Sequence, residues 1–159
     1  MSKEIFVDNN RVLKLKNILE YTINLSNITE EDDLNKKIKT FDDYIKNHNL
    51  SSFGPLIVRT SIVSGDNPKV LMKVIKQIRD VNHKTNIPYQ VLSELKTPNC
   101  VYSHFEGNQN DISIAQSKMQ VYAYEHDLVL DTICYLVYLS QQDDEVKVDT
   151  FIPILGSTH

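Results

Sequence analysis

The feature that most constrains the fold of this chain is an internal repeat with a spacing of 78 residues. At this spacing Tyr44 falls on Tyr122 and His48 falls on His126, and the apolar segments that follow also coincide. A repeated pattern with a repeated order of elements indicates a structural unit that occurs twice. His48 and His126 then stand at equivalent helix ends, where we expect each imidazole to bond the last carbonyls of its helix.

The first copy covers approximately residues 12–78 and begins with an extended apolar segment. A helix is predicted next, because Thr29 and Asp32 form a pair similar to a capping box. Apolar residues then keep helical spacing up to Ile45. The predicted strands of this copy are residues 12–25, 56–63 and 70–78. The last of them would also suit a short helix, and only the repeat decides for a strand.

The second copy covers approximately residues 89–155 and repeats this order. Pro98 interrupts its first extended segment, because proline cannot donate a ladder hydrogen bond. Asp111 is the predicted N-cap of its helix, which is expected to stop near His126. The predicted strands of this copy are residues 89–105, with a break at 97–99, then 132–140 and 146–155. In each copy a polar turn joins the last two strands into a predicted hairpin.

The repeat predicts one α+β domain over residues 1–159. Its expected architecture is a pair of strand–helix–strand–strand modules with pseudo-two-fold symmetry, forming an antiparallel sheet with two main helices on one face and a cleft between the halves. A chain of 159 residues is long enough for one continuous core. The linker, residues 79–88, is too short to separate independent domains. Residues 1–10 and 156–159 are expected to be frayed.

Composition and charge argue against several kinds of partner. The net charge is −4 with Lys and Arg dispersed along the chain, so we expect no nucleic acid partner. No apolar run approaches the ~20 residues that span a bilayer, and the start lacks a signal peptide's apolar segment, so we expect a cytoplasmic protein without membrane partners. Cys100 and Cys134 lack CxxC or metal-ligand spacing, so we expect buried thiols, no metal and no cofactor.

The second copy carries a recognisable series of residues. Residues 102–107 lead into its helix, the apolar residues 135–139 follow the helix, and the closing strand places Asp149 two residues before Phe151 and then an Ile-Pro-Ile segment. This series resembles the GyrI-like, or effector-binding, domain family, whose closing strand typically has an acidic residue, then an aromatic residue and an Ile-Pro pair. The first copy departs from the pattern, because Lys73 stands where Phe151 stands in the second.

The resemblance extends over about residues 12–154 and carries implications for fold and function. It implies paired modules around a pseudo-two-fold axis, with a cleft that holds small, often cationic or aromatic molecules. Regulators of the family carry a helix-turn-helix segment, which does not precede this domain, so a free-standing small-molecule-binding protein is implied. A similarity to small proteins encoded near Gram-positive specialised-secretion genes leaves a protein partner as the alternative.

Alternation along the strands divides the side chains of the second copy between two sheet faces. One face is expected to carry aromatic rings and a carboxylate, with Tyr138 or Tyr135 contributed by a neighbouring strand. Such a face suits a flat cation, through cation–π contacts and charge pairing. It would equally suit a solvated sheet surface. The candidate ligand-binding residues are Tyr102, His104, Tyr138, Asp149 and Phe151.

Catalysis is not expected, and no catalytic residue is assigned. The sequence contains no GxSxG, HExxH or phosphate-binding loop. Two alternative functions remain open. One is a protein-binding adaptor or chaperone that uses the concavity or an exposed strand edge. The other is a hydrolase of the same fold, in which Asp149 or Glu106 would transfer protons with Tyr102 or His104.

Overall fold

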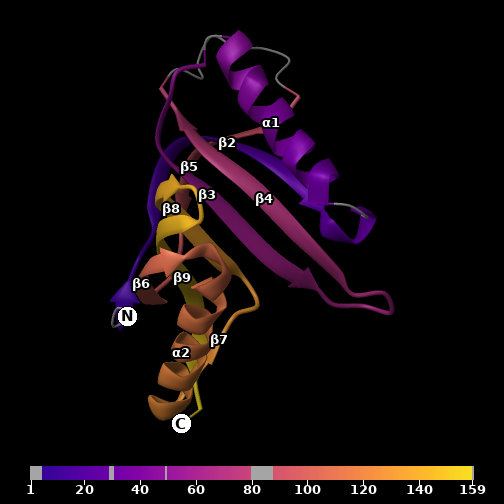
Figure 1. The fold of residues 1–159 in the computed structure, drawn as a ribbon. Coiled ribbons are helices and arrows are strands. Elements are labelled where there is room, and N and C mark those ends of the chain that lie inside the picture. Colours follow the sequence, from indigo (N-terminus) through magenta and orange to yellow (C-terminus); the bar gives the residue numbers. More distant parts are fainter. Residues whose placement is uncertain (1–4, 29–30, 49, 80–87, 159) are drawn as a thin grey trace.

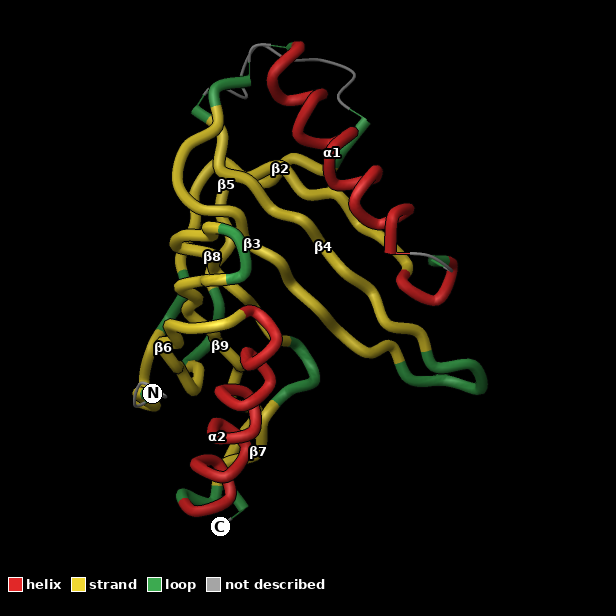
Figure 2. The backbone as a smooth tube through the Cα atoms, in the orientation of Figure 1, coloured by secondary structure: helices red, strands yellow, loops and turns green. Residues whose placement is uncertain are grey.

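The computed structural model describes residues 5–28, 31–48, 50–79 and 88–158. These residues form a nine-stranded sheet with two α-helices. Figure 1 and Figure 2 show how the helices lie beside the strands. Every strand pairing in the described residues is antiparallel. The predicted α+β class and the predicted antiparallel sheet are therefore confirmed.

The elements follow the predicted order with few exceptions. The strands are β1 (Phe6–Arg11), β2 (Lys14–Asn24), β3 (Ser52–Val63), β4 (Lys69–Ile78), β5 (Gln90–Lys96), β6 (Cys100–Asn108), β7 (Leu128–Leu130), β8 (Cys134–Gln142) and β9 (Glu145–Ser157). The helices are α1 (Glu31–Asn47) and α2 (Ile112–Glu125). Residues 70–78, whose spacing also suited a helix, are a strand because β2 and β3 pair with β4 on both sides.

The order of strands in the sheet is β1-β6-β9-β8-β3-β4-β2-β5, and β7 pairs with the outer end of β9. The chain runs through strand, helix, strand, strand as β2-α1-β3-β4 and again as β6-α2-β8-β9. The three strands of each series are neighbours in the sheet. The two series meet where β3 pairs with β8, from Leu56–Tyr138 to Thr60–Cys134.

The predicted extended segment 89–105 is divided between two distant strands. β5 pairs with β2 of the first series, whereas β6 pairs with β1 and β9. The crossing occurs at residues 97–99, where Pro98 lacks a backbone donor. It is held by the side-chain oxygen of buried Thr97, which accepts a hydrogen bond from the backbone N–H of Leu13 at 2.9 Å.

The expectation of frayed ends is wrong for the described residues. Residues 6–10 belong to β1, which pairs with β6. Residues 156 and 157 belong to β9 and pair with β7, and the N–H of Thr158 donates to the carbonyl of Asp127 at 2.8 Å. Residues 1–4 and 159, most of the predicted linker and the predicted cap Thr29 lie outside the described residues.

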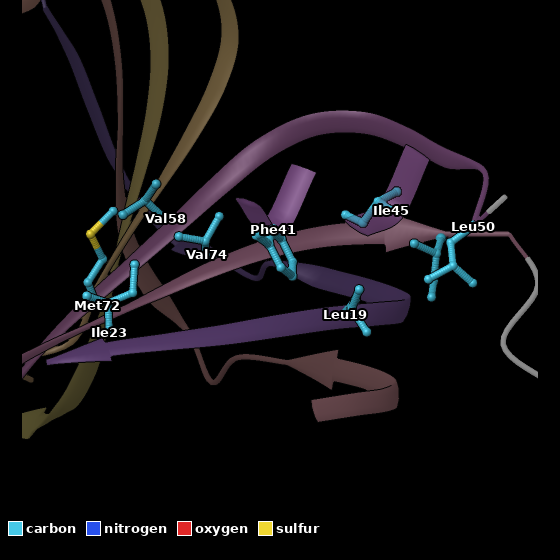
Figure 3. Packing of buried hydrophobic residues seen from close by; sticks show 9 residues of the cluster. Leu19, Ile23, Phe41, Ile45, Leu50, Val58, Met72 and Val74 are labelled. Atoms are coloured by element: carbon cyan, nitrogen blue, oxygen red, sulfur yellow. The ribbon is translucent and has the colours of Figure 1, made fainter. Parts of the chain in front are cut away.

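Helix α1 covers the first series through its apolar side. Phe41 and Ile45 pack against Leu19 of β2 and Val74 of β4, as Figure 3 shows. The ring of Phe41 is 1% exposed and lies 5.8 Å from the ring of Tyr21, centroid to centroid. The helical spacing of apolar residues therefore predicted the buried side of α1 correctly.

Helix α2 covers the second series in the same manner. Met119 packs against Val101 and Ile152, and Ala115 packs against Val148. Leu136 of β8 contacts the cores beneath both helices, so both helices lie on one face of the sheet. Neither helix in the described part of the chain is long and apolar enough to cross a membrane.

The ends of the helices test the capping predictions. Asp111 precedes α2 but makes no side-chain capping bond, because a 3-10 turn comes first and Asn108 caps that turn instead. The C-terminal prediction is confirmed. Nδ1 of His48 donates to the carbonyl of Tyr44 at 3.0 Å, and Nδ1 of His126 donates to that of Tyr122 at 2.8 Å. Each imidazole also stacks on the ring of that tyrosine.

Candidate functional site

The sheet face away from the helices carries two rows of side chains that cross the strands. Strand register fixes both rows. The first row is Phe6, His104, Asp149, Val137, Ile57, Ile75 and Glu20. The second row is Asp8, Tyr102, Phe151, Tyr135, Arg59, Lys73 and Thr22. The structure therefore brings together four of the five candidate residues, which are Tyr102, His104, Asp149 and Phe151.

Asp149 is the centre of a hydrogen-bonded cluster. Its Oδ1 accepts a bond from the hydroxyl of Tyr102 at 3.0 Å and one from Nδ1 of His104 at 2.6 Å. Nε2 of His104 lies 3.1 Å from Oε1 of Glu106, and Nζ of Lys147 lies 3.9 Å from the same oxygen. The side chain of Asp149 is 19% exposed and that of His104 is 34% exposed. The cluster is thus partly buried and reaches solvent through the imidazole.

The cluster raises the pKa of two of its members. The hydrogen bond with Asp149 is the main cause that raises the pKa of His104, and the bond with Glu106 adds to it while burial opposes it. Burial, followed by the hydrogen bond to Asp149, raises the pKa of Tyr102 to about 12. Tyr102 therefore remains a neutral donor at physiological pH, whereas the imidazolium form of His104 is favoured.

Aromatic rings continue from the cluster towards the edge of the sheet. The ring of Tyr102 lies 5.1 Å from that of Phe151 and 6.3 Å from that of Phe6, centroid to centroid. Phe6 is 53% exposed. The guanidinium of Arg11 lies 4.9 Å from the centroid of the Tyr102 ring. Arg11 therefore already occupies the cation–π position on the ring of Tyr102.

Tyr138, the fifth candidate, lies on the opposite face. It pairs with Val148 and Leu56, and it packs against the cores beneath both helices. Burial raises the pKa of its hydroxyl. Tyr135 takes the place beside Phe151 in the second row, and it is buried. The sequence left the two tyrosines as alternatives because the register between β8 and β9 decides which one shares a face with Asp149.

The sequence prediction missed three ionised residues in the middle of the same face. Glu20 is 2% exposed, and Nζ of Lys73 lies 3.3 Å from its Oε2 without the alignment of a hydrogen bond. The guanidinium of Arg59 lies 5.9 Å from the centroid of the Tyr135 ring. One signal was available, since Glu20 interrupts the apolar residues 18–23. A carboxylate in such a segment needs a buried partner.

A cavity of about 390 Å³ adjoins the cluster, beside the first turn of α2. Glu106 and Lys147 line it together with Asp111 and Glu145. Its apolar lining includes Phe105 and the side chains Ile5, Ile114 and Val146. Three carboxylates and one ammonium give this lining an excess of negative charge, and its volume is in the range of small-molecule sites.

Comparisons with known proteins bear on the fold. No protein-family model matches the chain, and no curated protein matches its sequence. The solved structure of the EcmrR C-terminal domain is similar with a TM-score of 0.67 and 11% sequence identity, over 96% of this chain and 98% of that one. EcmrR in a complex with DNA gives a TM-score of 0.66 and 10% identity, over 95% of this chain and 57% of that longer one.

A third similar structure is that of SAV2435 bound to tetraphenylphosphonium. Its TM-score is 0.49 and its sequence identity 10%, over 97% of this chain and 95% of that one. The chain therefore shares the fold of the EcmrR C-terminal domain over almost the full length of both. At such low identity the likeness concerns the fold alone.

Proposed function

We propose that this chain is a small-molecule-binding domain of the GyrI-like type without catalytic activity, and that its ligand is a small aromatic cation. One observation carries the proposal. A partly buried carboxylate, Asp149, is held by two donors beside aromatic rings, and His104 links it to Glu106, which lines an acidic cavity. Preformed pockets that combine apolar walls with a few fixed polar groups are typical of small-molecule sites.

The charge of the site supports a cation as the ligand. His104 and Lys147 offset part of the charge of Asp149 and Glu106, but Asp111 and Glu145 add two further carboxylates to the cavity. An aromatic cation can place its charge against these groups while one of its rings packs on the exposed ring of Phe6. Each well-placed ring contributes about 0.5 to 2 kcal/mol to such binding.

We infer further that the chain is a tandem duplication folded as one domain around a pseudo-two-fold axis. The two series of elements have the same order and meet at β3 and β8. The contacts between Tyr44 and His48 recur between Tyr122 and His126. In addition, β1 precedes the first series and pairs with β6 of the second, whereas β5 precedes the second series and pairs with β2 of the first. Each series therefore contributes a strand to the edge of the other.

The absence of catalysis is supported by the state of the nucleophilic groups. Burial raises the pKa of the Cys134 thiol to about 12, and the hydroxyl of Tyr102 is held neutral by burial and by Asp149. Both ring nitrogens of His104 are engaged by carboxylates. A hydrolase that used Cys134 or Tyr102 as its nucleophile would need that group to be activated near neutral pH.

Titration with tetraphenylphosphonium tests the proposal, with triphenylphosphine oxide as an uncharged comparison. We expect the cation to bind more tightly, and Asp149→Asn to weaken its binding about tenfold, which corresponds to about 1.4 kcal/mol. The asparagine keeps an oxygen that can accept the bonds from Tyr102 and His104. Tyr138→Phe, on the opposite face, is the matched control and should leave the affinity unchanged. Equal affinity in wild type and Asp149→Asn would refute the assigned site.

A further inference from the structure

A second and larger cleft lies on the helix side of the sheet, away from Asp149. Its volume is about 690 Å³. Helix α2 forms one wall with Gln116 and Gln120, which are one turn apart. The outer end of β3 forms the opposite wall with Thr60 and Ile62. Apolar side chains between the walls complete the lining, and these are Ala123, Leu128, Leu130, Ile133 and Ile152.

The β3 wall of this cleft is an unpaired strand edge. β3 pairs with β8 only as far as Thr60–Cys134, while its pairing with β4 continues to Val63–Lys69. The chain before Cys134 turns away from β3, since the N–H of Asp131 donates to the carbonyl of Pro153 at 2.9 Å. Within the described residues, the last three residues of β3 therefore have a sheet neighbour on one side alone.

An unpaired edge has a specific chemical requirement. Alternate residues of a strand direct their backbone N–H and C=O groups to the same side, so the outer end of β3 presents such groups towards the cleft. An extended peptide satisfies them by adding a strand in line with β8, and about 10 Å of edge is available over residues 61–63. The side-chain amide of Gln120 can bond the opposite side of the same peptide, as can the amide oxygen of Gln116, whose Nε2 donates to Sγ of Cys134 at 3.8 Å.

The lining also specifies the side chains of the occupant. Ile62 is 52% exposed at the mouth of the cleft, next to the apolar floor. Asp131 is the charged residue among the described side chains that line the cleft, and it lies at the end where the chain turns into β8. An apolar side chain fits the floor, and a basic side chain next to it fits Asp131.

We propose that this cleft binds a short extended peptide segment of a partner protein, which adds to the outer edge of β3 and carries an apolar residue beside a basic one. The site is separate from the cation site, because no residue lines both this cleft and the acidic cavity next to the Asp149 cluster. It gives the domain a protein partner in addition to a small-molecule ligand.

The test starts from random linear octapeptides displayed on phage and selected on the immobilised full-length chain. The enriched sequences are synthesised with a fluorescent label, and their affinity is measured by anisotropy. We expect apolar sequences with a basic residue. Gln120→Lys should weaken binding at least tenfold, while Lys118→Gln, an exposed change on the same helix away from the cleft, should not. Asp131→Asn should weaken the binding of the basic peptides. It should not weaken the binding of the same peptides with alanine in place of the basic residue.

Amide hydrogen exchange supplies the second measurement. The bound peptide should slow the exchange of outward-facing amides among residues 61–63, and methylation of the peptide backbone should abolish binding. The proposal would be overturned if no peptide were enriched or if Gln120→Lys bound the peptides as tightly as wild type. It would also be overturned if the bound peptide left the exchange of the amides at residues 61–63 unchanged. Occupation of the cleft by tetraphenylphosphonium in place of any peptide would also overturn it. Asp149→Asn should leave peptide binding intact, which separates this outcome from that of the cation site.

Discussion

Glu20 and Lys73, on the sheet face away from the helices, show how burial and charge act together. Glu20 is almost fully buried, and Lys73 is the cation that lies beside it. Removal of a buried charge from water costs several kcal/mol, and an attractive partner offsets this cost only when both charges remain. The free energy of unfolding should therefore fall more when one of the two residues is replaced than when both are replaced.

Replacement of Lys73 by methionine should destabilise the protein by about 3 kcal/mol, because Glu20 would remain buried without its cation. The double variant Glu20→Leu with Lys73→Met should recover most of that loss. Urea unfolding monitored by circular dichroism measures both free energies. A single variant as stable as wild type would show that Glu20 is neutralised in some other way.

His104 gives the stability of the protein a pH dependence. Its pKa is raised in the folded state by Asp149 and Glu106, so the folded state binds the proton more tightly than the unfolded state does. The resulting stabilisation is complete below the unfolded value of about 6.5 and is lost as the pH rises through the folded value. In His104→Gln the free energy of unfolding should no longer fall for this reason as the pH rises. Urea unfolding between about pH 6 and 8 measures the difference. His126→Gln is the control, and an identical pH profile for wild type and His104→Gln would contradict the account.

The positions of the helices and strands along the chain were predicted from the sequence more accurately than the pairing of the strands in the sheet. The positions of β2, α1, β3, β4, α2, β8 and β9 followed from periodicity, turn residues and the repeat. The break between β5 and β6 at residues 97–99 was also predicted, from Pro98. That the two strands pair with different series was not, because the pairing partner of a strand depends on long-range contacts and leaves no local pattern. The strand β1 was missed for the same reason, since its short polar sequence gains its place from β6.

Packing of α1 on the first series should depend on Phe41 above other residues. Its ring is buried between β2 and β4 and also contacts the ring of Tyr89. Phe41→Ala should destabilise the protein by about 3 to 5 kcal/mol through lost burial and the cavity left behind. Phe53→Ala, at a partly exposed position of β3, should cost about 1 kcal/mol or less. Chemical denaturation of the two variants compares these values, and similar losses would contradict the packing described.

At the scale of the whole molecule, some residues of the candidate site were predicted from the sequence and others were not. Alternation and the closing-strand motif led to Asp149 and Phe151, and the structure gathers Tyr102 and His104 around them. The side of Tyr138 was not predictable, because it depends on the register between two strands. The cavity beside the cluster could not be foreseen either, since it forms between the start of α2 and the β8–β9 hairpin.

A crystal structure of the protein with tetraphenylphosphonium tests the central claim most directly. The phosphonium centre should lie near Asp149 and Glu106, next to the acidic cavity, with a phenyl ring against Phe6. A cation bound far from both carboxylates, or only in the cleft between α2 and the outer end of β3, would contradict this claim.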